Sequence, residues 1–156
     1  MPPTIVIEIE AGRCLAQAVG LTFGEEPMAS GRIRAINKTR GTTLCQFIED
    51  AGGLSGQSRG LLGRDHLDPG HGMLFVRGRF APFMWMHMFF MRFPIDIVFI
   101  DRNNTVIRIN HALKPWRVSA VVFGASQALE LEAGAATRSA TQIGDSIVLE
   151  PVPRPA

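Results

Sequence analysis

The residues best suited to chemistry lie in one apolar stretch, Phe83 to Asp101, which reads FMWMHMFFMRFPIDIVFID. Its polar members include His87, Arg92 and Asp96. Placing such groups among apolar side chains is costly unless they are paired, so they are expected to be hydrogen-bonded or to have a function. These three residues are therefore the first candidates for a site.

Asp96 follows Pro94 at the start of a predicted strand. A buried carboxylate must accept hydrogen bonds from backbone amides, pair with an arginine, or be protonated. Arg92 and Arg59 are the available arginines. We predict that His87, Arg92 and Asp96, with Arg59 nearby, line a ligand-binding cleft at one end of the fold. The alternative, supported at least equally, is a polar clamp that fixes the chain where it crosses at Pro94.

The same stretch contains four of the seven methionines, and thioether sulfur favours soft ions such as Cu(I). On an extended strand Met84, Met86 and Met88 share one face, while His87 points to the other. One ion cannot be reached by all four side chains. Core packing is therefore the favoured interpretation of the methionines, and we predict no metal site and no cofactor.

The composition predicts one globular domain, because 156 residues with 46% hydrophobic and 19% charged residues fit an ordinary soluble core. No apolar run is long enough to span a bilayer, so no membrane insertion is expected. The first ten residues, MPPTIVIEIE, lack a basic leader, which favours a cytoplasmic location. Cys14 and Cys45 are too few for a disulfide framework.

Charge is distributed unevenly along the chain. Residues 32–64 contain six Lys or Arg against two acidic residues, whereas residues 1–31 contain one Arg against four Glu. The basic segment could attract an acidic partner. Its cations are not interleaved with exposed aromatic residues that could stack on bases, which argues against nucleic acid.

Short strands and turn signals dominate the rest of the sequence. A helix is predicted from Thr42 or Thr43 through Ile48, ending at Gly52, and shorter helical turns are predicted at 58–62 and 134–140. Residues 83–91 are apolar at odd and even positions, so they should be covered on both faces if they form a strand. The other predicted strands are 4–9, 32–37, 72–76, 95–100, 105–110, 128–132 and 146–150.

These elements predict an α+β, mainly β fold: a small, partly open antiparallel β-barrel with one or two short helices. We divide the chain into an N-terminal extension with an edge strand (1–31), a barrel-like domain (32–150) and a flexible tail (151–156).

Six motifs occur in a fixed order: RGLLGRDHL, GMLFV, HMFFMRFPIDIVFID, LKPWR, LELEAG and IGD. In these motifs the chain closely resembles the domain-of-unknown-function 192 family over about residues 32–150. The resemblance implies a partly open β-barrel and no established activity. Arg92 and Asp96 both match positions of the family motif MRFPID, so the resemblance implies that they belong to the same site. Members often have Asn-Thr or Thr-Gly where Met88, Phe89 and Phe90 stand here.

Three functions remain open. The favoured hypothesis is a non-enzymatic module that binds a small molecule or a protein partner beside His87, Arg92 and Asp96. The second is an enzyme that uses Asp96 or His87 as acid or base, although the sequence shows no motif for a nucleophile or a cofactor-binding loop. The third is an accessory protein whose basic segment 32–64 binds an acidic partner or nucleic acid.

Overall fold

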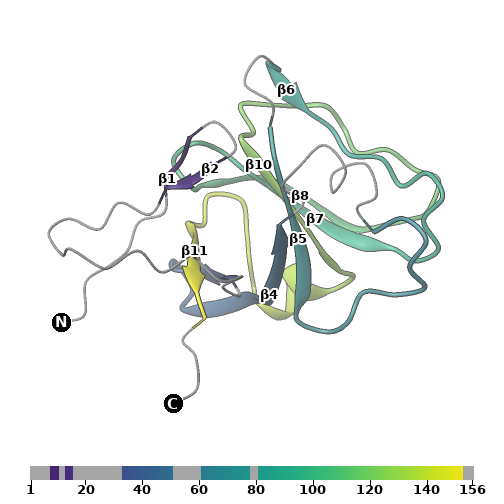
Figure 1. Cartoon of the computed structure of the whole chain (residues 1–156), viewed down its shortest axis with the longest axis horizontal. Coiled ribbons are helices and arrows are strands. Elements are labelled where there is room, and N and C mark those ends of the chain that lie inside the picture. The colour runs from purple at the N-terminus through teal and green to yellow at the C-terminus, as the bar shows by residue number, and fades with distance from the viewer. Residues whose placement is uncertain (1–7, 11–12, 16–32, 51–60, 78–80, 153–156) are drawn as a thin grey trace, which may run out of the picture.

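A mixed sheet forms the body of the computed structural model, which describes residues 8–10, 13–15, 33–50, 61–77 and 81–152 (Figure 1). Its seven strands lie in the order β11-β3-β4-β5-β10-β7-β8. Their bounds are β3 (Ile33–Asn37), β4 (Thr42–Asp50), β5 (His71–Val76), β7 (Ile95–Ile100), β8 (Val106–Leu113), β10 (Gln127–Glu132) and β11 (Ile147–Pro151).

The two edge strands of this sheet, β8 and β11, approach each other at one end. Thr105 and Ser146 form a β-bridge there, and the Ile147 amide donates to the Asn104 carbonyl at 2.8 Å. The sheet therefore curls into a partly open barrel, as the sequence predicts. One pair departs from the antiparallel prediction, because β4 and β5 run parallel.

The smaller elements are two two-stranded sheets and one short helix in the described residues. β1 (Glu8–Glu10) pairs with β2 (Arg13–Leu15), β6 (Phe83–Met84) pairs with β9 (Val122–Phe123), and α2 spans Ala135–Arg138. No helix in this part of the chain is long and apolar enough to cross a membrane. The boundaries of the predicted extension and tail stay predictions.

The prediction of a helix from residue 42 to residue 52 is wrong, because residues 42–50 form strand β4. The register of β4 against β3 shifts on both sides of Ala35, which marks a β-bulge or a similar irregularity. Such a shift breaks the alternation of the strand, and Leu44, Cys45 and Ile48 are all buried. Their spacing imitates one face of a helix, which explains the error. The predicted helical turn at 58–62 lies partly outside the described residues, and residues 61–63 form a turn.

Two hydrophobic clusters occupy opposite faces of the central strands, so every residue of β7 is buried. The first cluster contains Val98 and Ile100 together with the alanines of α2. The second contains Ile95, Ile97 and Phe99 and lies against residues 83–93, which we call the strap. Met84, Met88 and Met91 of the strap are buried in this cluster, in agreement with the packing interpretation.

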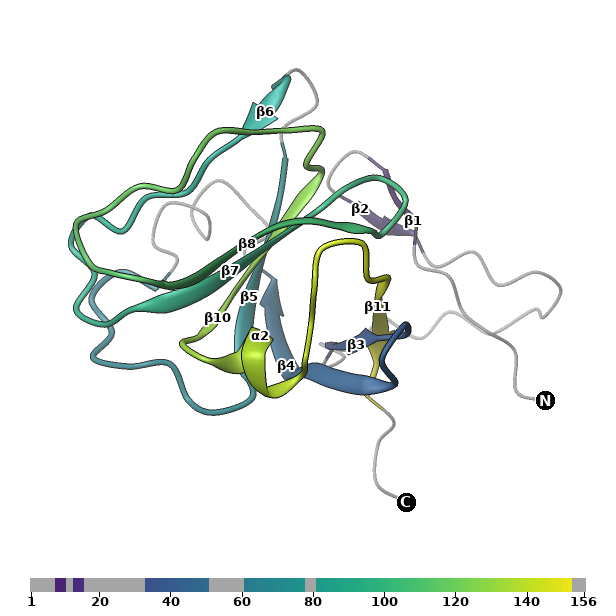
Figure 2. The same cartoon turned by 180° about the vertical axis from the view of Figure 1, so that it is seen from behind.

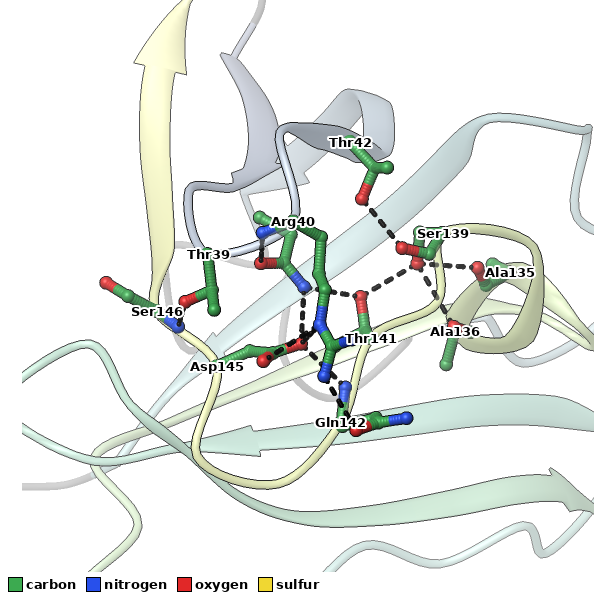
Figure 3. A network of polar contacts seen from close by, with 11 residues as sticks. Thr39, Arg40, Thr42, Ala135, Ala136, Ser139, Thr141, Gln142, Asp145 and Ser146 are labelled. Atoms are coloured by element: carbon green, nitrogen blue, oxygen red, sulfur yellow. Dashed lines mark hydrogen bonds and ion pairs between the residues drawn. The ribbon is translucent and has the colours of Figure 1, made fainter.

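A buried polar network joins the turn after β3 to the segment after α2 (Figure 3). Asp145 is its centre. Its carboxylate accepts hydrogen bonds from the side-chain Nδ2 of Asn37 at 2.9 Å, from Arg40 Nε at 3.1 Å and from the Gln142 backbone amide at 2.8 Å. Burial raises the pKa of Asp145, but these hydrogen bonds and the Arg40 charge outweigh it and hold the pKa below its usual value. The network fixes one end of the barrel.

Candidate binding face

Asp96 is a structural carboxylate in this fold. It is fully buried, and one oxygen accepts the Ala112 amide at 2.8 Å, while the other accepts the amides of Gly134 and Ala136 at 3.1 and 3.0 Å. These bonds tie β7 to the end of β8 and to the start of α2. They satisfy the first of the three options predicted for a buried carboxylate. A cleft open to solvent cannot include this side chain.

The structure does not bring His87 and Arg92 to Asp96. His87 and Arg92 are exposed on the strap, and Arg92 forms an exposed ion pair with Asp65. Arg59 lies outside the described residues. The predicted arrangement of three residues around one cleft is therefore wrong for Asp96, whereas ligand contact by His87 and Arg92 stays a prediction. No three His, Cys, Asp or Glu of the described residues are grouped to hold a metal ion.

His87 lies in the middle of a row of exposed rings. Its ring stacks on that of Phe89 with centroids 5.1 Å apart, and the Trp85 ring lies 6.0 Å away on the other side. Phe89 and Phe90 both contact the ring of Trp116, at 6.5 and 4.9 Å. We call this surface the aromatic face; its members are Phe83, Trp85, His87, Phe89, Phe90, Trp116, Val118, Val121 and Phe123.

Backbone hydrogen bonds build the aromatic face from two distant segments. The Met88 amide donates to the Arg117 carbonyl at 2.7 Å, and the Trp116 amide donates to the Met88 carbonyl at 2.8 Å. Strands β6 and β9 and the bridge between His87 and Val118 continue this pairing. Figures 1 and 2 show the two segments running side by side from β6 along the outside of the barrel. The inner side chains of the strap enter the core, so its outer side chains are left at the surface.

Of residues 83–91, only Phe83–Met84 form a strand, β6, and the expected cover on both faces is wrong. Phe90 is 69% exposed, Trp116 60% and Phe123 71%. Single exposed apolar residues are common, but a contiguous group of this kind marks an interaction surface.

Two of these exposed rings, Phe90 and Trp116, also have strained backbones. Phe90 has φ 62° and Trp116 has φ 64°, in the left-handed region that bulky residues avoid. Their side chains contact each other edge to face. Glycine or asparagine would adopt this conformation at lower cost and would expose no large apolar surface. Strain combined with exposure of this kind is expected where a residue contributes to function rather than to folding.

The surroundings of the aromatic face carry positive charge. Residues 81–95 contain Arg92, which is paired with Asp65, and no acidic residue, and residues 102–129 contain four Arg or Lys and no acidic residue. Lys114 and Arg117 flank Trp116, and no carboxylate of the described residues pairs with either. The face therefore combines apolar rings with unpaired cations.

Phe90→Asn is expected to change the free energy of unfolding by less than about 1 kcal/mol, because relief of the left-handed strain offsets the lost ring contact. Urea denaturation would measure this. Phe99→Ala is the matched control: that ring is fully buried on β7, and its loss should cost about 3–5 kcal/mol. A cost above about 2 kcal/mol for Phe90→Asn would mean that the ring supports the fold.

The family comparison matches this architecture. The family model DUF192, described as "Uncharacterized ACR", matches residues 35–149. The chain belongs to this family. The DUF192 match spans the mixed sheet from β3 to β11, together with the strap and the aromatic face. The family description assigns no activity.

Similar proteins support the same assignment. A UPF0127 protein of Pyrococcus abyssi is 30% identical over 81 residues, which cover 51% of this chain and 68% of that protein. A UPF0127 protein of Thermococcus sibiricus is 36% identical over 62 residues, which cover 40% of each chain.

Two solved structures share the fold, each with a TM-score of 0.63 over 80% of this chain. One, from Sinorhizobium meliloti, is 31% identical, is covered over 96% of its length and is described as a "putative transcription regulator". The other, from Novosphingobium aromaticivorans, is 22% identical, is covered over 90% of its length and is described as a protein of unknown function.

Sequence reasoning missed the second half of the aromatic face. Trp116 and Phe123 lie more than twenty residues from the strap, and their pairing with it depends on tertiary contacts. The available signal was compositional: residues 102–129 combine Trp116 and Phe123 with four cations and no acidic residue.

Proposed function

We propose that this protein is a non-enzymatic binding module whose aromatic face docks an acidic, apolar segment of a partner protein. The observation that carries the proposal is the Phe90–Trp116 pair. Both rings are exposed although their backbones are strained, and neither ring belongs to a hydrophobic core cluster. Binding of a partner would desolvate the two rings. His87 and Arg92 belong to the strap that forms this surface, and this keeps them as predicted contact residues.

The positive charges beside the aromatic face favour an acidic partner segment. Lys114 and Arg117 lie beside Trp116 without a described carboxylate partner, and the two segments that build the face contain no acidic residue. A segment with Asp or Glu between aromatic or aliphatic residues would satisfy both the rings and the cations. Such complementarity speeds association and disfavours basic partners.

The packing of the rings favours a protein partner over single-stranded nucleic acid. His87 and Phe89 stack on each other with centroids 5.1 Å apart, so the two ring faces that meet are not free to stack on a base. Val118 and Val121 add aliphatic surface without a flat π face. The relative from Sinorhizobium meliloti described as a transcription regulator makes DNA a necessary competitor in any test.

The alternatives have less support. An acid or base role for Asp96 conflicts with its complete burial and its three backbone donors. In the basic segment, the described cations already have carboxylate partners: Arg34 and Lys38 contact Glu150, Arg40 contacts Asp145, and Arg64 contacts Glu49. Among these described cations, little free charge is left for an acidic partner.

Selection of a displayed random peptide library on the full chain would test the proposal. We expect enriched peptides that combine Asp or Glu with aromatic or aliphatic residues. Phe90→Asn combined with Trp116→Ser should weaken their binding about a hundredfold, because hot-spot aromatic residues carry most of an interface's free energy. Arg117→Glu should weaken it mainly by slowing association.

Ile143→Ser is the matched control, because Ile143 is 67% exposed but lies outside the aromatic face. This variant should bind the selected peptides like the wild type. Equal binding by the aromatic double variant would overturn the proposal. It would also be overturned if single-stranded DNA, duplex DNA or anionic vesicles bound the face more tightly than every selected peptide.

A further inference from the structure

A concave site lies on the barrel face occupied by the first core cluster, away from the aromatic face. It is a cleft of about 360 Å³ where β4, the Pro69–Gly70 loop and α2 meet. Leu44, Cys45 and Ala135 of its wall belong to that cluster. Figure 2 shows α2 beside β4 at this end of the sheet. The volume falls within the range of small-molecule sites.

The floor of the cleft is closed and chemically inert. A Cβ atom on Gly72 would lie 2.7 Å from Leu131 Cδ2 and 2.9 Å from Cys45 Sγ, so the chain beneath the cleft is tightly packed. Cys45 Sγ lies 3.3 Å from the Phe47 carbonyl oxygen and 3.2 Å from that of Gly70, either of which accepts its single S–H, and burial raises the pKa of the thiol to about 11. A thiol of this kind does not act as a nucleophile at neutral pH, which favours binding over catalysis.

One negative and one positive side chain stand together in the wall. Glu132 and Arg138 form an ion pair, with side-chain exposures of 19% and 58%. The same Glu132 oxygen, Oε1, receives the Gly70 amide at 3.4 Å, whereas Oε2 has no hydrogen-bond donor among the described residues. The guanidinium of Arg138 donates to one described acceptor, although it carries five N–H groups. Both groups therefore keep hydrogen-bonding capacity for a ligand.

Neutral polar groups complete the rim. The side chains of Thr43 and Gln46 are exposed there, and neither hydrogen-bonds to another side chain or backbone group of the described residues. A ligand with one charge would attract one member of the Glu132–Arg138 pair and repel the other. A ligand that carries both charges close together satisfies both members.

We propose that this cleft binds a small zwitterion of the α-amino-acid type, with its carboxylate against Arg138 and its ammonium group against Glu132. Thr43 and Gln46 would hydrogen-bond the remaining polar atoms, and Leu44 and Ala135 would contact a short side chain. This site is independent of the aromatic face, so the two proposals can fail separately.

Titration of the ¹⁵N-labelled full chain with glycine, L-alanine and L-serine, followed by NMR, tests the site. We expect saturable shifts of the Gly70 amide and the Arg138 Nε resonance at millimolar concentrations. Acetate and methylammonium, each carrying one of the two charges, should bind at least about tenfold more weakly at matched ionic strength.

Arg138→Gln and Glu132→Gln should each weaken zwitterion binding by about tenfold or more. Arg64→Gln is the control, because it breaks a partly exposed Arg–Glu ion pair, with Glu49, that lies outside the cleft. The proposal is overturned if no amino acid shifts the cleft resonances. It is equally overturned if acetate binds as tightly as alanine and Glu132→Gln has no effect, which would describe an anion site.

Discussion

Asp96→Ala is expected to lower the free energy of unfolding by about 3–5 kcal/mol, a large part of the stability of a domain of this size. The carboxylate accepts three backbone N–H groups, from Ala112, Gly134 and Ala136. Alanine would leave all three without an acceptor. The Ala136 amide is fully buried, so water cannot replace the lost partner there without opening α2.

Asp96→Asn separates the loss of an acceptor from the loss of volume. An asparagine side chain offers one oxygen and one NH₂ group, whereas Asp96 uses both oxygens as acceptors. In either orientation the NH₂ group would face at least one backbone N–H. Asparagine should therefore cost nearly as much as alanine despite its similar shape.

Asp101→Ala provides the comparison, measured by urea denaturation alongside the Asp96 variants. Asp101 accepts the amides of Asn103 and Thr105 at 2.8 and 2.9 Å, but in an accessible turn where water can take its place. Its loss should cost about 1 kcal/mol. If the Asp96 and Asp101 variants were equally stable, the clamp at Asp96 would not be a principal support of the fold.

The strand from Ile95 to Ile100 was predictable because several signals agree there. Its apolar run is bounded by Pro94 and by Asn103-Asn104, and both faces are buried. The options for Asp96 were also predictable, since a buried carboxylate has few. The sequence could not indicate which partners it meets, because Gly134 and Ala136 arrive from about forty residues away.

The errors have physical causes of the same kind. The register shift between β3 and β4 places Leu44 and Cys45 in the core together, and this broken alternation resembles a helix in the sequence. The strap is apolar on both faces, which normally indicates full burial. In this protein its outer residues are exposed on the aromatic face, so apolar character on both faces did not mean burial on both faces.

Raising the pH from 5 to 8 is expected to destabilise the protein through Glu130. This side chain is 6% exposed, and burial raises its pKa to about 8 from an ordinary value of 4.5. Its directly opposite neighbours are Met73 on β5 and Ile97 on β7, and the structure gives it no hydrogen-bond partner in the described residues. The carboxyl group is therefore buried in its neutral form near pH 7.

The sign of the effect follows from proton binding. Between pH 4.5 and 8 the folded state holds a proton on Glu130 that the unfolded state has released. Stability therefore falls as the pH rises through this window, by up to about 1.4 kcal/mol per pH unit, and the decline ends above the folded pKa. Asp145 and Glu150 have lowered pKa values, so their contributions are present above about pH 4.5 and change little in the window.

Glu130→Gln should remove this slope, because glutamine is neutral at every pH. Urea denaturation at pH 5 and pH 8 should show a wild-type loss on the order of 3 kcal/mol that is absent in the variant. Glu150→Gln should keep the wild-type slope, since Glu150 pairs with Lys38 and Arg34 and titrates below the window. A slope in Glu130→Gln equal to that of the wild type would mean that Glu130 is charged and stabilised in the fold. In that case, a group donating to its carboxylate would have to lie outside the described residues.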